Sequence, residues 1–158
     1  MGKELKTNAI RILDKAKIKY ELNTYQCDEF IDAVKIADML SQPYESSYKT
    51  LVAKGKSNDY FVFCVPIAQE LDMKKAAKSV NEKSVELIPV KDINSVTGYI
   101  RGGCTPIGMK KQFKTVIDQT AKCFDTIIIS GGRIGTQIFL SPNDLANLIG
   151  AEFCDITK

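Results

Sequence analysis

Histidine is absent from the sequence, although the chain is 158 residues long. Without imidazole there is no Ser-His-Asp triad, no Cys-His pair, no histidine general base and no histidine metal ligand. Any catalysis must therefore use Lys, Asp, Glu, Tyr, Cys, Ser or Thr side chains, backbone dipoles, or a group that the substrate supplies.

Long apolar runs are absent as well. No window approaches eighteen uninterrupted apolar residues, so no membrane-spanning helix is predicted. The stretch MGKELKTNAIRILDKAKI is charged and amphipathic and lacks the apolar centre of a secretory signal. Lys6 stands where a myristoylation motif needs Ser or Thr. We therefore expect a cytoplasmic protein without a membrane partner.

Cysteine is present but forms no paired motif. The five cysteines are scattered, odd in number and without a CxxC pair. This pattern indicates neither a disulfide framework nor a zinc site. We expect small apolar core residues in a reducing compartment, and no metal or organic cofactor. Cys104 differs from the other four cysteines, because it lies inside a glycine-rich loop.

The length predicts one domain, residues 1–158. Hydrophobic residues make up 44% of the chain and charged residues 26%, a balance that is typical of globular proteins. Helical spacing and caps predict helices over 3–17, 29–40, 72–80, 119–124 and 141–150, with one helical turn or a plain turn over 92–98. Strands are expected over 18–23, 48–56, 60–68, 84–90, 114–118, 125–132, 136–140 and 151–156. This irregular order predicts the α/β class (mixed α+β), with a mixed, curved sheet surrounded by helices.

The stretch GGCTPIGMKK, residues 102–111, looks at first like a phosphate-binding loop. A Walker loop needs GxxxxGK followed by Ser or Thr. Met109 occupies the lysine position, so a Walker loop is not predicted. The glycines still allow positive φ angles and a close backbone approach to a ligand. A purely structural turn explains them equally well.

Lysines gather in two places although the net charge is only +3. A local basic face of this kind can contact an RNA backbone, and it can equally be a solvated surface. No aromatic RNA-recognition motif and no zinc finger accompanies the lysines, so sequence-specific DNA or RNA binding is not predicted. The clusters are Lys74, Lys75 and Lys78, and Lys110, Lys111 and Lys114.

The chain closely resembles the YbaK/EbsC family of aminoacyl-tRNA deacylases. From the NTY of residues 23–25 to the C-terminus, the segments follow the family's order: YKTLVAKG, MKKAAKSV, GYIRGGCTPIGMKK, DTIIISGGRIG and LIGAEFCDI. The form Gly-Gly-x-Ser/Thr-Pro-x-Gly-x-Lys-Lys resembles the YbaK branch, which clears Cys from mischarged Cys-tRNA(Pro). Branches that act on Ala-tRNA, and the editing insert of bacterial prolyl-tRNA synthetases, carry a different loop.

The resemblance also implies a set of site residues. The family's essential lysine corresponds to Lys49, and the family's pocket positions correspond to Tyr25, Phe30 and Thr50. From the residues alone, a solvent-facing strand lysine and core aromatic rings are equally natural. The resemblance further implies that Gly102 and Gly103 approach the scissile ester through their backbone and that Ser130 lies beside the site.

The implied reaction needs no histidine. An aminoacyl ester is already activated, so positioning and polarisation can supply much of the rate. In the YbaK branch the cysteinyl thiol attacks its own ester carbonyl and leaves as a cyclic thioester, and prolyl-tRNA synthetase is the usual partner. Two departures bear on substrate preference: Arg133-Ile134 replaces a common Lys-Arg, and Gln137 replaces an acidic residue of some members. A thiol at Cys104 would also make the enzyme sensitive to oxidation.

Two alternatives stay open on the sequence. One is a deacylase of the same fold for another small residue, such as Ala or Ser. The other is a non-catalytic module that binds tRNA ends or a synthetase.

Overall fold

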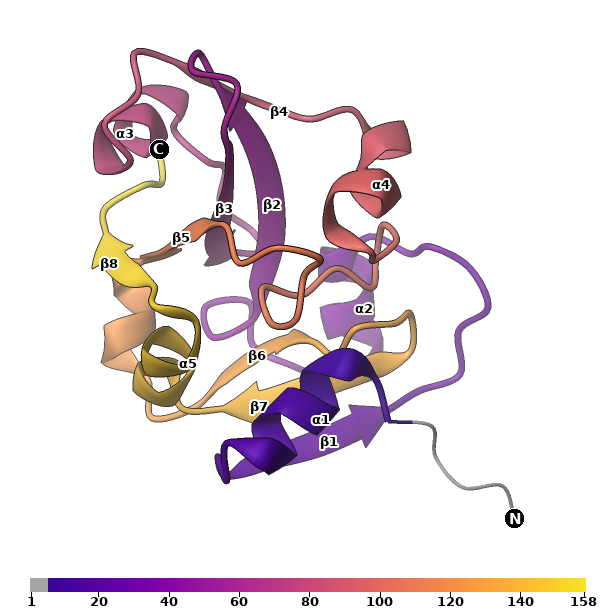
Figure 1. The fold of residues 1–158 in the computed structure, drawn as a ribbon. Coiled ribbons are helices and arrows are strands. Elements are labelled where there is room, and N and C mark those ends of the chain that lie inside the picture. Colours follow the sequence, from indigo (N-terminus) through magenta and orange to yellow (C-terminus); the bar gives the residue numbers. More distant parts are fainter. Residues whose placement is uncertain (1–5) are drawn as a thin grey trace.

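Strands and helices follow one another in an irregular order in the computed structural model, which describes residues 6–158 (Figure 1). The strands are β1 (Tyr20–Thr24), β2 (Tyr48–Gly55), β3 (Tyr60–Pro66), β4 (Val85–Leu87), β5 (Lys114–Asp118), β6 (Ile127–Ser130), β7 (Thr136–Leu140) and β8 (Glu152–Cys154). The α-helices are α1 (Asn8–Lys15), α2 (Ala33–Met39), α3 (Met73–Ser79), α4 (Ile93–Thr97) and α5 (Pro142–Ile149), and the 3-10 helices are η1 (Val90–Asp92) and η2 (Gln119–Cys123).

The strands form two sheets that meet at one point. The larger has the order β4-β2-β3-β5-β8, with β2 antiparallel to its neighbours and β3, β5 and β8 parallel. The smaller is antiparallel, with the order β1-β7-β6. An isolated parallel bridge between Ser47 and Ile128 joins β6 to the residues just before β2. The predicted mixed α/β fold is confirmed, and the expected curved sheet is divided in two.

Strand β3 separates two hydrophobic clusters because successive side chains of a strand point to opposite faces. Cys64 packs with the first cluster, which fills the space between the smaller sheet, α1 and α5. Phe63 and Val65 pack with the second cluster, beneath α3. A strand buried on both faces needs a continuous apolar run, and YFVFCVP supplies one.

Helix ends agree well with the capping residues. Asp72 caps α3 by accepting hydrogen bonds from two backbone N–H groups, and α5 has Ser141 at its N-cap and Gly150 in the left-handed region at its end. Helix α2 is shorter than predicted, because Asp32 accepts from the N–H of Val34 and so starts the helix at Ala33, not at residue 29. Phe30 therefore lies in a loop. Of the helix expected over 3–17, residues 3–5 lie outside the described part of the chain.

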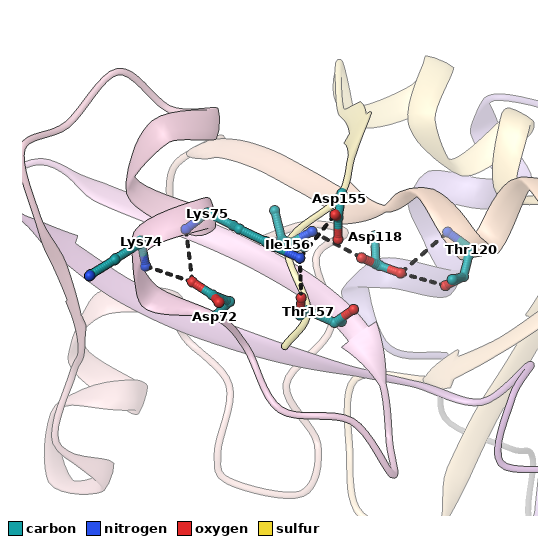
Figure 2. A network of polar contacts seen from close by, with 8 residues as sticks. All are labelled: Asp72, Lys74, Lys75, Asp118, Thr120, Asp155, Ile156 and Thr157. Atoms are coloured by element: carbon teal, nitrogen blue, oxygen red, sulfur yellow. Dashed lines mark hydrogen bonds and ion pairs between the residues drawn. The ribbon is translucent and has the colours of Figure 1, made fainter.

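The C-terminal segment is fastened to the rest of the molecule by a polar network (Figure 2). The buried carboxylate of Asp118 accepts from the backbone N–H of Ile156 at 3.1 Å and from the Thr120 hydroxyl at 2.6 Å. Lys75 donates to the Asp155 carboxylate at 2.9 Å and to the Thr157 carbonyl at 2.8 Å. The chain end is thus held against α3, as Figure 1 shows.

Within residues 6–158, no helix combines the length and apolar character needed to cross a bilayer.

Candidate active site

A cavity of about 400 Å³ lies along the open edge of β2. Its walls come from β2, the loop before α2 with α2 itself, the glycine-rich loop, the ends of β6 and β7, and the segment from β4 to α4. The cavity exists because β6 meets β2 only at its beginning, through Ser47, and β4 pairs only with its end, from Ala53 onward. Between these two points, no strand among residues 6–158 pairs with the edge, although the Val52 carbonyl accepts from the Ile88 N–H at 3.0 Å.

The open edge presents main-chain groups to the cavity. Ser47 C=O accepts from Ile67 N–H, and Gly55 N–H donates to Asp59 C=O, so the odd-numbered residues of β2 bond toward β3. In an antiparallel ladder the residues between them bond toward the other side. Thr50 is such a residue, and neither β4 nor β6 pairs with it. Its N–H and C=O are therefore available to a ligand.

Six of the seven site residues predicted from the sequence line this cavity: Tyr25, Phe30, Lys49, Thr50, Gly102 and Ser130. They come from the end of β1, the loop before α2, β2, the glycine-rich loop and β6. The seventh, Gly103, does not line the cavity. Residues that lie up to about a hundred positions apart in the sequence are thus collected around one space.

Lys49 and Thr50 leave β2 on opposite faces. Thr50 lies opposite Cys64 in the β2–β3 ladder, and its hydroxyl is 4.0 Å from the Cys64 sulfur. Lys49 lies opposite Val65. Both line the cavity because the cavity follows the edge of the strand. Within residues 6–158, no hydrogen bond or ion pair engages the Lys49 ammonium, which leaves it available to a substrate.

Ser130 carries a buried hydroxyl that has no hydrogen-bond partner in the described part of the chain. Buried hydroxyls are usually satisfied, so an unpaired one that lines a cavity points to a ligand group. Tyr48, which also lines the cavity, is in contrast fully engaged. Its hydroxyl lies 2.8 Å from that of Thr120, which in turn donates to the buried Asp118 carboxylate.

Gly102 and Phe30 are in tight contact at the mouth of the cavity. Gly102 has φ +87°, and a Cβ added to it would lie 3.1 Å from Cδ1 of Phe30. The glycine thus provides both a left-handed backbone and the space for the ring. Arg101 stacks on the same ring, with Cζ 3.9 Å from its centroid.

Gly103 holds the glycine-rich loop to its neighbour. A Cβ added here would lie 2.7 Å from Cα of Arg133, a backbone atom that cannot easily move. The N–H of Gly103 donates to the Ile100 carbonyl at 2.9 Å, so it is already used inside the loop. The structure therefore places Gly103 behind the cavity wall, where only glycine lets the two loops pack.

The cysteines in and beside the cavity are poorly suited to act as nucleophiles. Burial raises the pKa of the Cys104 thiol, which lines the cavity, to about 11. Burial likewise raises the pKa of the Cys64 thiol to about 12. The thiolate is the reactive form, so both groups are almost entirely inactive thiols at neutral pH. The raised pKa of the Cys104 thiol also argues against the sensitivity to oxidation that the sequence suggested.

Three ionised side chains line the cavity in the part of the chain that the structure describes: Asp32, Lys49 and Arg101. One oxygen of the Asp32 carboxylate caps α2 by accepting from the Val34 N–H. No cluster of three potential metal ligands is found among residues 6–158. The cavity therefore offers positive charge, an unpaired hydroxyl and free main-chain groups.

A family model described as "Aminoacyl-tRNA editing domain" matches residues 29–148, which include the loop before α2, β2, the glycine-rich loop and β6. This chain belongs to the aminoacyl-tRNA editing domain family. The resemblance seen in the sequence segments is thereby confirmed.

Relatives of this editing domain occur both alone and inside a larger enzyme. The present chain is 40% identical to "Putative Cys-tRNA(Pro)/Cys-tRNA(Cys) deacylase EbsC" of Enterococcus faecalis (strain ATCC 700802 / V583). The match covers 96% of this chain and 93% of that protein. The present chain is also 31% identical to a segment of the proline–tRNA ligase of Fervidobacterium nodosum (strain ATCC 35602 / DSM 5306 / Rt17-B1). That match covers 63% of this chain and 17% of the ligase.

Solved structures with low sequence identity share the fold of this editing domain. The structure described as hypothetical protein APE2540 has a TM-score of 0.87 at 18% identity, covering 96% of this chain and 99% of that one. The structure described as "a putative trans-editing enzyme for prolyl tRNA synthetase" has a TM-score of 0.81 at 20% identity, covering 98% and 99%. At such identities the likeness concerns the fold alone.

Arg133 and Gln137, singled out in the sequence, have different surroundings in the editing domain. Arg133 turns back onto its own loop, where Nε donates to the Thr136 hydroxyl at 3.0 Å. Gln137 lines the cavity and forms hydrogen bonds with Gln42 and Asn23. The three side chains form a neutral amide network at this part of the cavity wall.

Gln42 and Arg101 were not predicted from the sequence as site residues. Gln42 lies in the SQPYESS segment, which signals only the end of a helix. Arg101 directly precedes the two glycines and could have been singled out as the cation nearest to a loop shaped for backbone approach.

Proposed function

We propose that this protein is a trans-editing enzyme that hydrolyses the ester of mischarged Cys-tRNA(Pro), with Cys-tRNA(Cys) as a second substrate. Membership of the editing-domain family and the name of the E. faecalis relative support this substrate class. We further propose that the thiol of the substrate, not a side chain of the protein, is the nucleophile.

One observation carries the mechanistic part. Among the described residues, the cavity is lined by Lys49, whose ammonium forms no hydrogen bond or ion pair, and by Ser130, whose buried hydroxyl is unpartnered, but by no pair of activated nucleophile and base. The sequence has no histidine, the Asp32 carboxylate caps a helix, and the pKa of the Cys104 thiol is raised. Such a cavity can position and polarise an ester but cannot readily attack it.

The proposed first step is internal to the substrate. The cysteinyl sulfur forms a bond to the ester carbonyl carbon, and the bond from that carbon to the ribose oxygen breaks. The thiol proton goes to the departing ribose oxygen. The products are tRNA with a free terminal hydroxyl and a four-membered cyclic thioester, which water then opens to cysteine.

Each cavity residue then has a defined task. The Lys49 ammonium donates to the ester carbonyl oxygen and stabilises the negative charge that develops there. Gly102 lets the loop backbone approach the ester, and the Thr50 carbonyl accepts from the substrate's α-ammonium. The Ser130 hydroxyl holds the ribose. Tyr25 and Phe30 exclude water from the cysteinyl side chain.

Hydrolysis of Cys-tRNA(Pro) by the wild type and by Lys49→Ala tests this proposal. We expect kcat/KM to fall about 100-fold or more in the variant, the range for loss of one charge-stabilising donor. Lys54→Ala is the matched control, since Lys54 lies on the same strand but does not line the cavity. Its kcat/KM should stay within about twofold of the wild type.

Ala-tRNA(Pro) and Ser-tRNA substrates separate the alternatives. If the substrate thiol is the nucleophile, neither is hydrolysed above the uncatalysed rate. Hydrolysis of the Ala ester would contradict thiol assistance and favour a deacylase for other small residues. Unchanged decay of every ester on addition of the protein would favour a module that only binds tRNA ends or a synthetase.

We propose prolyl-tRNA synthetase as the partner that supplies tRNA selectivity. The match to part of a proline–tRNA ligase supports this pairing. We expect that adding the synthetase raises the deacylation rate of Cys-tRNA(Pro) but not that of Cys-tRNA(Cys). Equal effects on both tRNAs would contradict the partnership.

A further inference from the structure

Arg101 and Phe30 form a stacked pair at the mouth of the cavity. The guanidinium carbon lies 3.9 Å from the centroid of the ring, within stacking contact. Both residues line the cavity, and both are exposed, Phe30 by 41%. The ring covers one side of the guanidinium and Arg101 is exposed as a residue, so part of its side chain remains accessible to a ligand.

The position of the Phe30 ring in the stack contributes little to the stability of the fold. An aromatic ring 41% exposed stabilises the fold less than a buried ring does. Within residues 6–158, no carboxylate pairs with Arg101 and no hydrogen bond is formed by its guanidinium. Apart from its contact with the Phe30 ring, the charge of Arg101 is therefore unpaired among the described residues.

The cavity lining contains the Asp32 carboxylate and also exposed aliphatic side chains. Leu87, 42% exposed, and Val90, 54% exposed, line the same cavity, and Ile100 next to Arg101 is 52% exposed. A planar cation on an aromatic ring, beside exposed aliphatic side chains, is a surface on which a nucleobase can stack, with the guanidinium edge free to meet a phosphate.

We propose that Arg101, held in place by Phe30, binds the 3′-terminal adenine of the tRNA, so that ring, guanidinium and base form a three-layered stack. This inference rests on the proposed function for the identity of its ligand. The stack places the terminal nucleotide at the mouth, beside Gly102, and directs the ester toward Lys49 inside. Arg101 is thus a positioning residue and does not touch the reacting atoms.

Binding of the trinucleotide CCA tests the stack without any catalysis. The comparison probe is the same trinucleotide with an abasic 3′ residue, and both are titrated at low salt against wild type and Arg101→Ala. The wild type should bind CCA about tenfold more tightly than the abasic probe, within the range of one base stack. In the variant this preference should disappear. A preference that persists in Arg101→Ala would overturn the inference.

Charge and stacking are separated by two further variants. Arg101→Lys keeps the charge but loses the plane, so it should lose most of the preference for CCA. Lys111→Ala removes an exposed charge from the same loop and should retain the preference fully. If Arg101→Lys bound like the wild type, stacking would be refuted, because charge alone would explain the binding.

Kinetics distinguish failure of this inference from failure of the proposed function. With Cys-tRNA(Pro), Arg101→Ala should raise KM about tenfold and leave kcat nearly unchanged, since the chemical step is untouched. Normal KM in an active Arg101→Ala enzyme refutes the stack and leaves the deacylase intact. Absence of deacylation in the wild type refutes the proposed function, whereas the CCA titration still decides the stack.

Discussion

Gln42 and Gln137 exchange two hydrogen bonds between their side-chain amides. Gln42 Nε2 donates to Gln137 Oε1 at 2.8 Å, and Gln137 Nε2 donates to Gln42 Oε1 at 3.0 Å. Asn23 adds a third bond, donating to Gln137 Oε1 at 3.1 Å. The amide pair joins the segment after α2 to β7, two parts of the cavity wall that are 95 residues apart.

The amide pair should be energetically coupled. Gln137→Ala leaves the partly buried amide of Gln42 unsatisfied, and Gln42→Ala does the same to Gln137, so each should destabilise the fold by about 1–3 kcal/mol. The double variant should be little worse than either single one, so the coupling energy in a urea-unfolding cycle should be about as large as one single loss, about 1–3 kcal/mol. Fully additive losses would show that the two amides act independently.

Gly103→Ala should damage the loop packing. The added Cβ would meet the Arg133 backbone at 2.7 Å, and relieving such a clash typically costs about 1–3 kcal/mol. We expect a lower Tm and reduced deacylation, because the loop, with Gly102, moves relative to Ser130. Gly150→Asn is the matched control: nothing lies within 4 Å of a Cβ there, and Asn tolerates the left-handed backbone at φ +67°. A Gly103→Ala protein as stable as the control would contradict this packing role.

Cys104→Ser should leave the deacylase active. Because burial raises the pKa of the Cys104 thiol to about 11, its thiolate fraction at pH 7 is of order 10⁻⁴. The thiol should therefore react slowly with iodoacetamide at pH 7, and faster as the pH approaches 11. The exposed Cys123 should be modified first. Loss of turnover in Cys104→Ser, with Cys123→Ser unaffected, would identify a protein nucleophile and contradict substrate assistance.

Alkaline pH should destabilise the fold. Burial raises the pKa of Cys64 to about 12, and also raises the pKa values of Tyr48 and Tyr99 to about 12. Above about pH 9–10 the unfolded chain loses these protons while the folded chain keeps them. Stability is therefore fully present below pH 9 and declines between about pH 9 and 12.

Thermal unfolding across this range checks the alkaline effect. Each buried group lowers the free energy of unfolding by about 1.4 kcal/mol for each pH unit above its unfolded pKa, up to its folded pKa. Each kcal/mol lost lowers Tm by about 2–4 °C in a chain of this size. Cys64→Ala has a lower Tm throughout, but its slope between pH 9 and 11 should be shallower. An unchanged slope would exclude Cys64 as a source of the effect.

Local signals in the sequence predicted much of the fold. The apolar runs of β2, β3, β6 and β7 and the caps at Asp72 and Ser141 were recognised, because hydrophobic periodicity and capping act over a few residues. Strand β1 was less well described. It begins at Tyr20 and not at residue 18, and alternation does not fix which of its faces is buried. Tyr20 packs against the first hydrophobic cluster, whereas Leu22, on the same face, is 37% exposed, and Asn23, on the other face, bonds to Gln137.

The sequence by itself determined the chemistry that is possible. The absence of histidine, the glycine-rich loop and the segments around Lys49 and Ser130 are local properties, and they led to the editing-domain family that the comparisons confirm. Only the tertiary structure decided where that chemistry takes place. It divided the strands into two sheets and left the edge of β2 at Thr50 open. It also placed Gly103 behind the cavity wall and stacked Arg101 on Phe30. These contacts join residues far apart in the chain, and no spacing along the sequence encodes which edges and faces will meet.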